Sequence, residues 1–413
     1  MTNLSLVKLN TLCNKITDGS HYSPKGVSDG IPMLSVKDMK ENGFDYSDCK
    51  FVDNEVYSKL VRSDCKPLKN DILIAKDGSY LKYVFVIKTE IDQAILSSIG
   101  ILRPNLSKIN PDYLKYYLQT QSVKETVSRK YVSGSALPRI ILKNFGEIKV
   151  IYKNLKEQSN ISKILIDLDT KIELNNKINA ELEAMAKLIY DYWFVQFDFP
   201  DQNGKPYKSS GGKMVYNNEL KREVPEEWEI GTLLEIADFQ NGLACQKYRP
   251  ISKDFLRVIK IKDMKEGFSA KTEKVRADVP DKIKIFNGDI LFSWSASLEV
   301  IQWSGGEGAL NQHIFKVTSE KYPKSYYYFE LLNYLQHFKM MADLRKTTMG
   351  HITQEHLKQS RIVIPPKKII NQLDGVINPI LKKVNKNKIE NQKLAELRDW
   401  LLPMLMNGQV KVN

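Results

Sequence analysis

The sequence predicts an α+β protein: two similar α/β domains separated by two long helices that pack as an antiparallel coiled coil with pseudo-twofold symmetry. The first observation is an internal repeat, because "VKDMKE" (36–41) recurs as "IKDMKE" (261–266). Further matches keep the same order, and the offset between the copies falls from 225 to about 212 residues. They pair "NDILIAKDGS" (70–79) with "GDILFSWSAS" (288–297) and "NFGEIKVIY" (144–152) with "HLKQSRIVIP" (356–365). A series of ordered matches indicates a duplicated framework with loops of different length.

The repeat divides the chain into five consecutive parts. Each copy mixes short strands rich in Ile, Val, Phe and Tyr with helical stretches, then ends in an apolar strand and a long helical segment. The turn-rich stretch "DQNGKPYKSSGGK" (201–213) predicts a linker or an exposed loop. The expected parts are a first domain (1–150), a first long helix (151–200), a linker (201–222), a second domain (223–365) and a second long helix (366–413).

Both long helices carry a heptad seam, in which apolar residues recur at alternating steps of three and four. The first seam consists of Ile161, Leu165, Leu168, Ile172, Asn175, Asn179, Leu182, Ala186, Ile189 and Trp193. A shift of 212 residues gives the second seam: Leu373, Ile377, Ile380, Val384, Asn387, Asn391, Leu394, Arg398, Leu401 and Leu405. Ala186 and Arg398 occupy equivalent positions and make the pattern imperfect.

Two asparagines lie in the middle of each seam. A buried asparagine weakens a coiled coil but fixes its register, because only one alignment lets the amides pair. In an antiparallel pair, Asn175 faces Asn391 and Asn179 faces Asn387, whereas a parallel pair would match Asn175 with Asn387. We favour the antiparallel form, which places one globular domain at each end of a spacer. The alternative is that all four asparagines face solvent.

Composition narrows the class of partner. Lysine and arginine total 62 against 49 aspartate and glutamate residues, which leaves a net charge of +13. Such a surplus favours a polyanion, nucleic acid first and an anionic membrane second. The start "MTNLSLVKLN" lacks the regions of a signal peptide, and no apolar run reaches the roughly 18 residues of a membrane span. We therefore expect a cytoplasmic protein.

Metal and cofactor chemistry have little support in the sequence. The four cysteines (13, 49, 65 and 245) have no C-x-x-C spacing, which favours free thiols over a zinc site. The five histidines show no ligand spacing. Neither an N/D-P-P-Y/F segment nor a phosphate-binding G-x-x-x-x-G-K-[ST] loop is present. We expect no cofactor, no metal and no catalytic residue.

The chain resembles the specificity subunits of type I restriction–modification enzymes over nearly its whole length. The resemblance is carried by the order of several strings within the doubled architecture. These are "ITDGSHYSPKGVSDGIPMLSVKDM" (16–39), "LNNKINAELEAMAKLIYDYWFVQFDFPDQNGKPYKSSGGKMV" (174–215), "VPEEWEIGTLLEI" (224–236), "GDILFSWSAS" (288–297), "GALNQHIFKV" (308–317) and "LAELRDWLLPMLMNGQV" (394–410).

This resemblance implies two target-recognition domains, each reading one half of a split, asymmetric site on double-stranded DNA. It implies that the long helices set the gap between the half-sites. It also implies two modification subunits, which methylate adenine, and restriction subunits as partners. The specificity subunit itself carries no catalytic centre in that family.

Three segments of each domain have the residue types that contact DNA, namely cations for phosphates and amides or hydroxyls for base edges. They are 18–26 with 241–250, 75–82 with 293–297, and 128–140 with 344–353. The candidate DNA-binding residues are Ser20, His21, Tyr22, Lys25, Lys76, Arg129, Lys130, Arg139, Gln246, Lys247, Arg249, Arg345, Lys346, Thr347 and His351. Trp294 and Trp303 are interpreted as core residues, and the repeated "KDMKE" as scaffold.

Two other functions fit the same features. One is a stand-alone two-domain DNA-binding regulator or architectural protein, which would bind its site tightly without partners. The other is a coiled-coil adaptor without a nucleic-acid role, which would show no salt-dependent DNA binding.

Overall fold

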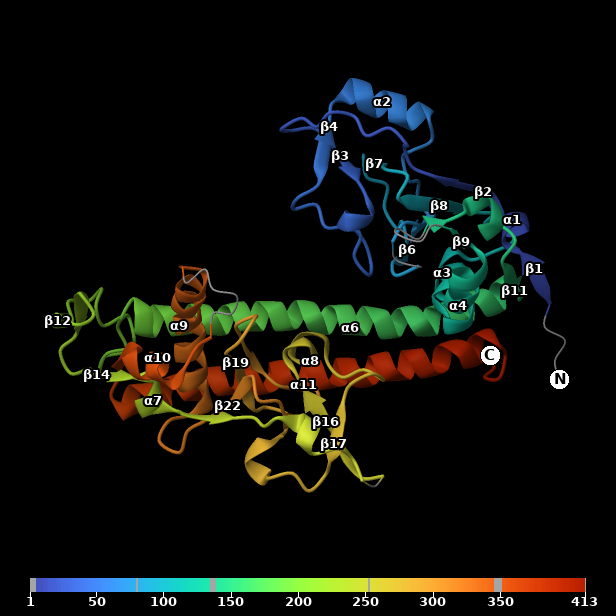
Figure 1. The fold of residues 1–413 in the computed structure, drawn as a ribbon. Coiled ribbons are helices and arrows are strands. Elements are labelled where there is room, and N and C mark those ends of the chain that lie inside the picture. Colours follow the sequence, from blue (N-terminus) through green and yellow to red (C-terminus); the bar gives the residue numbers. More distant parts are fainter. Residues whose placement is uncertain (1–4, 79–80, 134–138, 252, 345–350, 413) are drawn as a thin grey trace. The chain divides into compact units, whose positions relative to one another are not determined.

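The computed structural model describes residues 5–78, 81–133, 139–251, 253–344 and 351–412 of the chain. These residues form two compact units. The first unit contains residues 1–170 and 394–413, and the second contains residues 171–393. Two long helices, α6 (Leu155–Tyr190) and α11 (Lys367–Met406), each continue from one unit into the other (Figure 1). Each unit is therefore completed by helix residues from both copies of the repeat.

The first copy of the repeat contains short strands and helices in alternation. Its strands are β1 (Leu6–Lys8), β2 (Cys13–Asp18), β3 (Ile31–Leu34), β4 (Lys50–Val52), β5 (Ile72–Ala75), β6 (Val84–Val86), β7 (Ala94–Ile95), β8 (Ile99–Pro104), β9 (Val132–Ser133), β10 (Arg139–Ile140) and β11 (Lys149–Ile151). Its helices are α1 (Leu9–Leu12), η1 (Val36–Asp38), α2 (Asn54–Arg62), α3 (Pro111–Gln119), α4 (Gln121–Lys130) and α5 (Leu142–Phe145).

The second copy follows a π-helical turn, η2 (Asp191–Val195), at the end of α6. Its strands are β12 (Met214–Asn217), β13 (Arg222–Pro225), β14 (Glu229–Thr232), β15 (Asp238–Asn241), β16 (Phe255–Ile259), β17 (Lys274–Arg276), β18 (Lys284–Ile285), β19 (Ile290–Ser293), β20 (Glu299–Gln302), β21 (Gly308–Leu310), β22 (Ile314–Thr318) and β23 (Arg361–Ile364). Its helices are α7 (Leu233–Ile236), η3 (Cys245–Lys247), α8 (Ile261–Glu266), η4 (Asp281–Ile283), α9 (Lys324–Leu344) and α10 (Gln354–Gln359).

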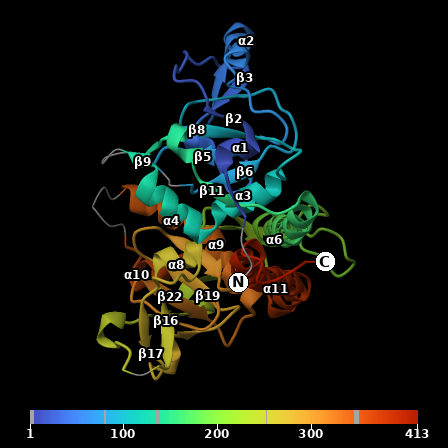
Figure 2. The same ribbon diagram turned by 90° about the vertical axis from the view of Figure 1, so that its right-hand side faces the viewer.

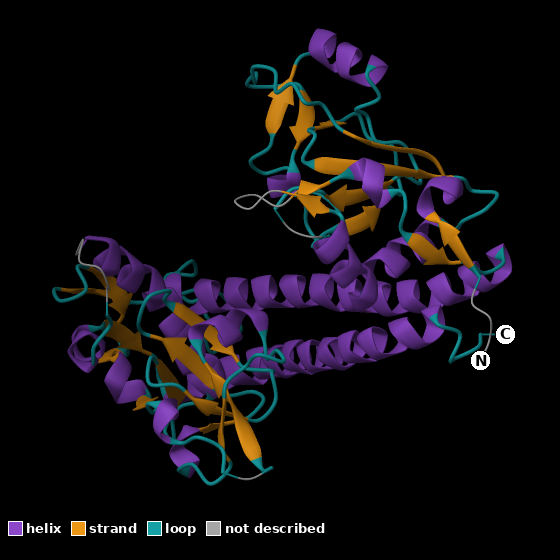
Figure 3. Ribbon diagram, turned by 45° about the vertical axis from the view of Figure 1, so that its right-hand side comes forward, coloured by secondary structure: helices purple, strands orange, loops and turns teal. Residues whose placement is uncertain are grey.

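The main sheets of the two copies have the same strand order, and the smaller sheets differ by one added strand, β18, in the second copy, which confirms the predicted duplication. The main sheet has the order β2-β8-β5-β6 in the first copy and β15-β22-β19-β20 in the second. Figure 2 labels β2, β8, β5 and β6 of the first copy and β22 and β19 of the second, and Figure 3 colours the strands of both copies orange. A smaller sheet, β4-β3-β7, corresponds to β17-β16-β21-β18. In each copy an early strand pairs antiparallel with the closing strand, β1 with β11 and β14 with β23.

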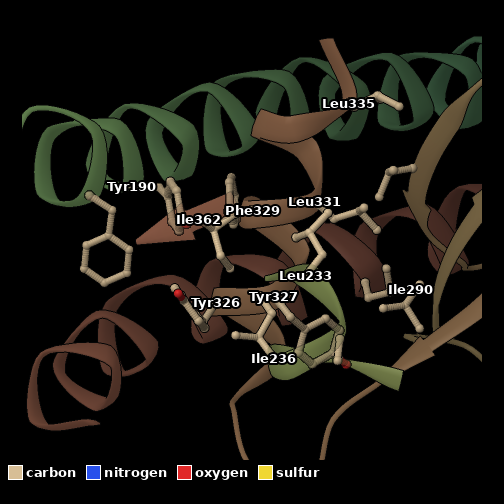
Figure 4. Packing of buried hydrophobic residues seen from close by; sticks show 14 of the residues in the cluster. Tyr190, Leu233, Ile236, Ile290, Tyr326, Tyr327, Phe329, Leu331, Leu335 and Ile362 are labelled. Carbon is tan, nitrogen blue, oxygen red and sulfur yellow. The ribbon is translucent and has the colours of Figure 1, made fainter. Parts of the chain in front are cut away.

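Each unit has its own hydrophobic core. In the first unit, Tyr113 and Phe145 of the globular part are buried together with Ile161 and Leu165 of α6 and Leu405 of α11. In the second unit, side chains from α7, α9 and β23 pack around the end of α6 (Figure 4). The Tyr190 ring stacks on Phe329, with 5.2 Å between centroids. Both cores thus anchor a globular part to the long helices.

The repeated "KDMKE" string has a structural role in both copies. Asp38 is buried, and its carboxylate accepts hydrogen bonds from the amide (2.7 Å) and the hydroxyl (2.9 Å) of Ser35. Asp263 accepts the amide of Lys260 at 3.1 Å. Each aspartate therefore stabilises the start of a helical turn that follows a strand. These contacts support the scaffold interpretation.

The central asparagines of the helices pair as the antiparallel arrangement predicts. Asn175 Nδ2 donates to Asn391 Oδ1 at 2.9 Å, and Asn387 Nδ2 donates to Asn179 Oδ1 at 2.9 Å. Asn175, Asn179 and Asn387 are buried, so the solvent-facing alternative is wrong for these three. Asn179 Nδ2 has no hydrogen-bond partner among the described residues. All members of both seams are buried or half-buried.

Several simpler expectations can be compared with the described residues. Cys49, Cys65 and Cys245 are buried free thiols, and Cys13 is a half-buried one. The stretch 201–213 consists mainly of turns, in which Tyr207 stacks on Phe199 at 4.6 Å. No helix in the described ranges combines the length and the apolar character needed to cross a bilayer. Within the same residues, no group of three or more His, Cys, Asp or Glu side chains is arranged to hold a metal ion.

Candidate nucleic-acid interface

Strand direction brings two predicted segments of the first copy together. β2 and β5 are both antiparallel to β8, so they are parallel to each other and end on the same side of the sheet. Asp18 is the last residue of β2, and Ala75 is the last residue of β5. The segments that follow them, 18–26 and 75–82, therefore start side by side.

Side-chain and backbone contacts link these two segments to each other and to the third predicted segment, 128–140. The Lys76 ammonium pairs with the carboxylate of Asp18, which also lies 3.2 Å from Nε2 of His21. The carbonyl of Lys76 accepts the amide of Ile140 at 3.0 Å. Arg139 Nε lies 3.3 Å from Oδ2 of Asp77. We call this group of residues (18–26, 76–77 and 139–140) the first edge.

The second copy repeats this arrangement with different side chains. Asn241 ends β15 and Ser293 ends β19, again on the same side of the sheet. Trp294 Nε1 donates to Oδ1 of Asn241 at 3.1 Å. The carbonyl of Trp294 accepts the amide of Ile352 at 2.9 Å, as that of Lys76 accepts Ile140. We call this group (241–249, 293–297 and 351–352) the second edge.

A glycine is required at the same corner of both edges. Gly19 follows Asp18, and a Cβ added to it would lie 2.1 Å from the carbonyl oxygen of Ile95. Gly242 follows Asn241, and its Cβ would lie 2.2 Å from the carbonyl oxygen of Asn311. Only glycine permits so close an approach of two backbones. This constraint explains the glycine at the start of both loops.

Most of the candidate residues are on the surface. The exposed candidates in the first copy are His21, Tyr22, Lys25, Arg129, Lys130 and Arg139, and those in the second copy are Gln246, Lys247 and Arg249. Arg129 and Lys130 end α4, two residues before β9, which pairs with β10 at Arg139. Gln246 and Lys247 lie on η3, above the buried Cys245. Exposed cations next to hydroxyl, amide and aromatic groups can contact both phosphates and base edges.

Lys76 requires a correction. Its side chain is buried, and its ammonium pairs with Asp18 inside the domain. Taking such a lysine to a phosphate would leave the carboxylate of Asp18 without this partner in a poorly solvated place, which is costly. We therefore remove Lys76 from the candidate DNA contacts and assign it to the framework of the edge.

The remaining candidates have mixed positions. Ser20 is half-buried, and its hydroxyl donates to the carbonyl of Tyr22 at 2.7 Å, so it shapes the loop. His351 is half-buried, with its ring 5.4 Å from that of Trp294. Arg345, Lys346 and Thr347 lie outside the described residues. The same holds for residues 79–80 and 134–138 of the predicted segments.

The structure adds three residues that the sequence did not indicate. Trp294, interpreted as core, is half-buried at the second edge, whereas Trp303 is buried as expected. Lys50 Nζ donates to Ser23 Oγ at 2.6 Å and so supports the loop of the first edge. Lys265 Nζ donates to Ser297 Oγ at 2.8 Å at the second edge. Lys265 lies in the repeated "KDMKE" string, but no local pattern indicates either contact, because each one joins distant parts of the chain.

Two copies of a mixed α/β domain, each with a polar edge and each followed by a long helix, define a class of duplicated recognition proteins. Residues 6–184 and 225–399 match the family described as the type I restriction modification DNA specificity domain. The chain therefore belongs to this family, whose domain occurs twice in it.

Named relatives agree with this assignment. The chain is 26% identical to the type I restriction enzyme MjaVIII specificity subunit of Methanocaldococcus jannaschii, over 92% of this chain and 89% of the relative. It is 24% identical to the HindI specificity subunit of Haemophilus influenzae, over 83% and 87%. The crystal structure of a type I restriction–modification S subunit from M. genitalium covers 98% of this chain and 97% of its own, with a TM-score of 0.56. At 14% identity, that likeness shows the fold alone.

Proposed function

We propose that the chain supplies DNA sequence specificity to a type I restriction–modification complex by reading a bipartite, asymmetric site. Residues 1–150 and 223–365 are the two target-recognition domains, and each reads one half-site through its edge. The observation that carries the proposal is the duplicated edge. Both edges have the same backbone connection, Lys76 to Ile140 and Trp294 to Ile352, but they present different side chains. A common frame with divergent contacts is what two readers of different sequences need.

The side chains of the edges support double-stranded DNA as the ligand. Lys25, Arg139, Lys247 and Arg249 are exposed cations suited to phosphates, and the charge surplus of the chain is +13. Tyr22 is 71% exposed, which is unusual for a large aromatic side chain without a partner. Polar and aromatic groups of this kind contact base edges or sugars in DNA grooves.

Exposed apolar residues on the helices support two docking sites for modification subunits. Met185 and Leu188 of α6 are 52% and 67% exposed in the second unit. A shift of 212 residues leads to Leu397 and Trp400 of α11 in the first unit, which are 43% and 57% exposed. Apolar patches of this kind indicate protein contacts. Because the patches are equivalent under the repeat, we infer that each receives one copy of the same subunit.

Chemistry in this proposal belongs to the partners. The modification subunits methylate adenine, the restriction subunits cut, and this chain selects the site without a catalytic residue, metal or cofactor of its own. The paired asparagines of α6 and α11 keep the two helices in one alignment, and the helices set the gap between the half-sites.

Methylation sequencing tests the proposal. Cells that contain the modification and restriction subunits, with and without this chain, are compared for methylated adenines. We expect one split adenine motif to require the chain, and the doubly substituted Lys247→Ala/Arg249→Ala chain to weaken methylation of that motif. Arg361→Ala is the matched control, because Arg361 lies on the closing strand β23 and pairs with Glu219 at 3.2 Å. Unchanged methylation in the absence of the chain would refute the proposal.

A binding experiment separates this function from that of a stand-alone regulator. The purified chain is titrated with DNA that carries the motif, at several salt concentrations, with and without modification subunits. We expect specific protection only in the complex. Tight specific binding by the chain alone would favour the regulator, and no salt-dependent binding in either form would favour an adaptor.

A further inference from the structure

The two residues that interrupt the heptad seams have different surroundings. Ala186 of α6 is fully buried among apolar side chains of the second unit. Arg398 of α11, its equivalent in the first unit, turns its guanidinium to an acidic partner. Arg398 Nη1 lies 2.8 Å from Oδ1 of Asp169 on α6. The interruption in the second helix is therefore an ion pair across the two long helices.

Asp169 extends this ion pair to the globular part of the first unit. Its Oδ2 accepts the hydroxyl of Tyr116 at 2.6 Å and lies 3.6 Å from Nζ of Lys115, and both residues belong to α3. Arg398 Nη1 also lies 3.9 Å from Oε1 of Glu41. One carboxylate thus connects α6, α11 and α3. Burial lowers the pKa of Lys115, an effect that the charge of Asp169 opposes.

The second unit holds its globular part differently at the equivalent place. A cavity of about 350 Å³ in the first unit is bordered by Lys115, Tyr116 and Asp169. A cavity of about 430 Å³ in the second unit is bordered by their counterparts Tyr328, Phe329 and Leu381. Phe329 and Leu381 are buried in the apolar core of that unit. An ionic contact in one unit therefore corresponds to an aromatic and aliphatic contact in the other.

Salt acts on these two kinds of contact in opposite ways. Ions in solution screen this pair in part, because the side chains of Arg398 and Asp169 are 22% and 17% exposed and partly buried pairs are screened less than exposed ones. Apolar contacts are not screened, and many salts strengthen them.

We propose that Arg398 is a positioning residue that holds the first globular domain on the helix pair through Asp169, so that salt loosens the first domain and leaves the second in place. Through the proposed function, this property makes reading of the first half-site more sensitive to salt than reading of the second. The attachment of the first globular domain to the helix pair does not itself depend on that function.

Hydrogen exchange of the full-length chain directly tests the attachment of the first globular domain to the helix pair. Peptides that cover residues 111–119 of α3 and 324–332 of α9 are followed at roughly 0.05 M and 0.5 M salt, a range over which screening strengthens several-fold. Because a partly buried pair is screened only in part, we expect exchange of the α3 peptide to rise about threefold with salt, and that of the α9 peptide to stay constant. Arg398→Ala should raise α3 exchange at low salt to at least the high-salt level, and Arg398→Lys should restore part of the protection. Lys388→Ala is the matched control, because it removes an ion pair with Glu183 (2.7 Å) in the second unit.

An equal effect of Arg398→Ala on both peptides, or an unchanged salt response of α3 in this variant, would overturn the proposal. Methylation assays with modification subunits form a separate arm, in which Arg398→Ala should reduce the salt dependence of the methylation rate to the part that comes from phosphate contacts. Suppose that neither the wild-type chain nor any variant supports methylation, but the exchange results are as expected. The proposed function is then wrong, whereas the proposed role of Arg398 in attaching the first domain is supported.

Discussion

Trp294 donates its indole Nε1–H to the side-chain oxygen of Asn241 at 3.1 Å, where the first copy has the ion pair of Lys76 with Asp18. A neutral hydrogen bond and a buried charge pair thus occupy the same corner of two related domains. Because the backbone connection next to each pair is the same, the corner tolerates either chemistry provided that both partners are present.

The Lys76–Asp18 pair is expected to be strongly coupled. Replacing Lys76 by Met leaves the Asp18 carboxylate poorly solvated and should destabilise the first unit by roughly 3–5 kcal/mol, a cost typical of breaking a buried pair. Lys76→Met combined with Asp18→Asn should lose less than the single variant. Urea unfolding of the four forms gives the coupling energy. Additive losses would show that the two side chains act independently.

Arg139 is expected to contact DNA phosphate. Its side chain is 64% exposed, and its pair with Asp77 at 3.3 Å is weak enough to be exchanged for a phosphate. Arg139→Ala should weaken DNA binding of the assembled complex and reduce the slope of log K against log salt by about 1. Arg361→Ala serves as the control, and its slope should equal that of the wild type. An unchanged slope for Arg139→Ala would remove this residue from the interface.

The Asn179–Asn387 pair is expected to lower the free energy of unfolding but to fix the register of the two long helices. Asn179 Nδ2 is a buried donor without a partner among the described residues, which is unfavourable. Replacing both residues by Leu should raise the free energy of unfolding by about 1–3 kcal/mol. The same change should loosen the register, so that native mass spectrometry of the complex shows mixed assemblies. A less stable variant with one assembly would contradict both expectations.

Glu330 is expected to make stability depend on pH. Burial raises its pKa to about 7 from the usual 4.5, although the hydroxyl of Tyr190 donates to it. Because the folded-state pKa is above the unfolded value, the stabilisation is complete below about pH 4.5 and is lost as the pH rises through about 7.

Glu330→Gln removes this dependence and keeps an acceptor for Tyr190. The variant should match the wild type near pH 4.5 and exceed it by roughly 3 kcal/mol well above pH 7, the free energy that such a pKa shift implies. Chemical unfolding at the two pH values measures the difference. The same difference at both values would assign the effect to packing.

The helix pairing could be predicted from the sequence because its pattern is periodic and repeated. Asn175 and Asn391 were paired correctly, because each seam has two asparagines at equivalent positions. An antiparallel pair matches the first asparagine of one seam with the second asparagine of the other. The duplicated sheets followed from the ordered matches for the same reason. Both features depend on spacing, which a sequence states directly.

The site was predicted less well because burial of single polar residues depends on distant partners. Lys76 follows a strand and looks like an exposed loop lysine, but Asp18, 58 residues earlier, holds it inside. Trp294 was interpreted as core, and its bond to Asn241 depends on how β15 and β19 are placed around β22. Strand direction determines which loops lie close together. The burial and partners of an individual side chain depend on distant residues, which no local pattern shows.

The contribution of α11 to the first unit has a consequence for biosynthesis. Leu405 and Met406 are buried in the same core as Leu9, Leu12 and Phe145. A ribosome makes these helix residues after the whole of the second unit, whose residues end at 393. During translation, part of the apolar surface of the first domain therefore stays exposed until the end of α11 is synthesised. Such exposure favours aggregation or chaperone binding. The domain that is synthesised first is the one whose folding is completed last.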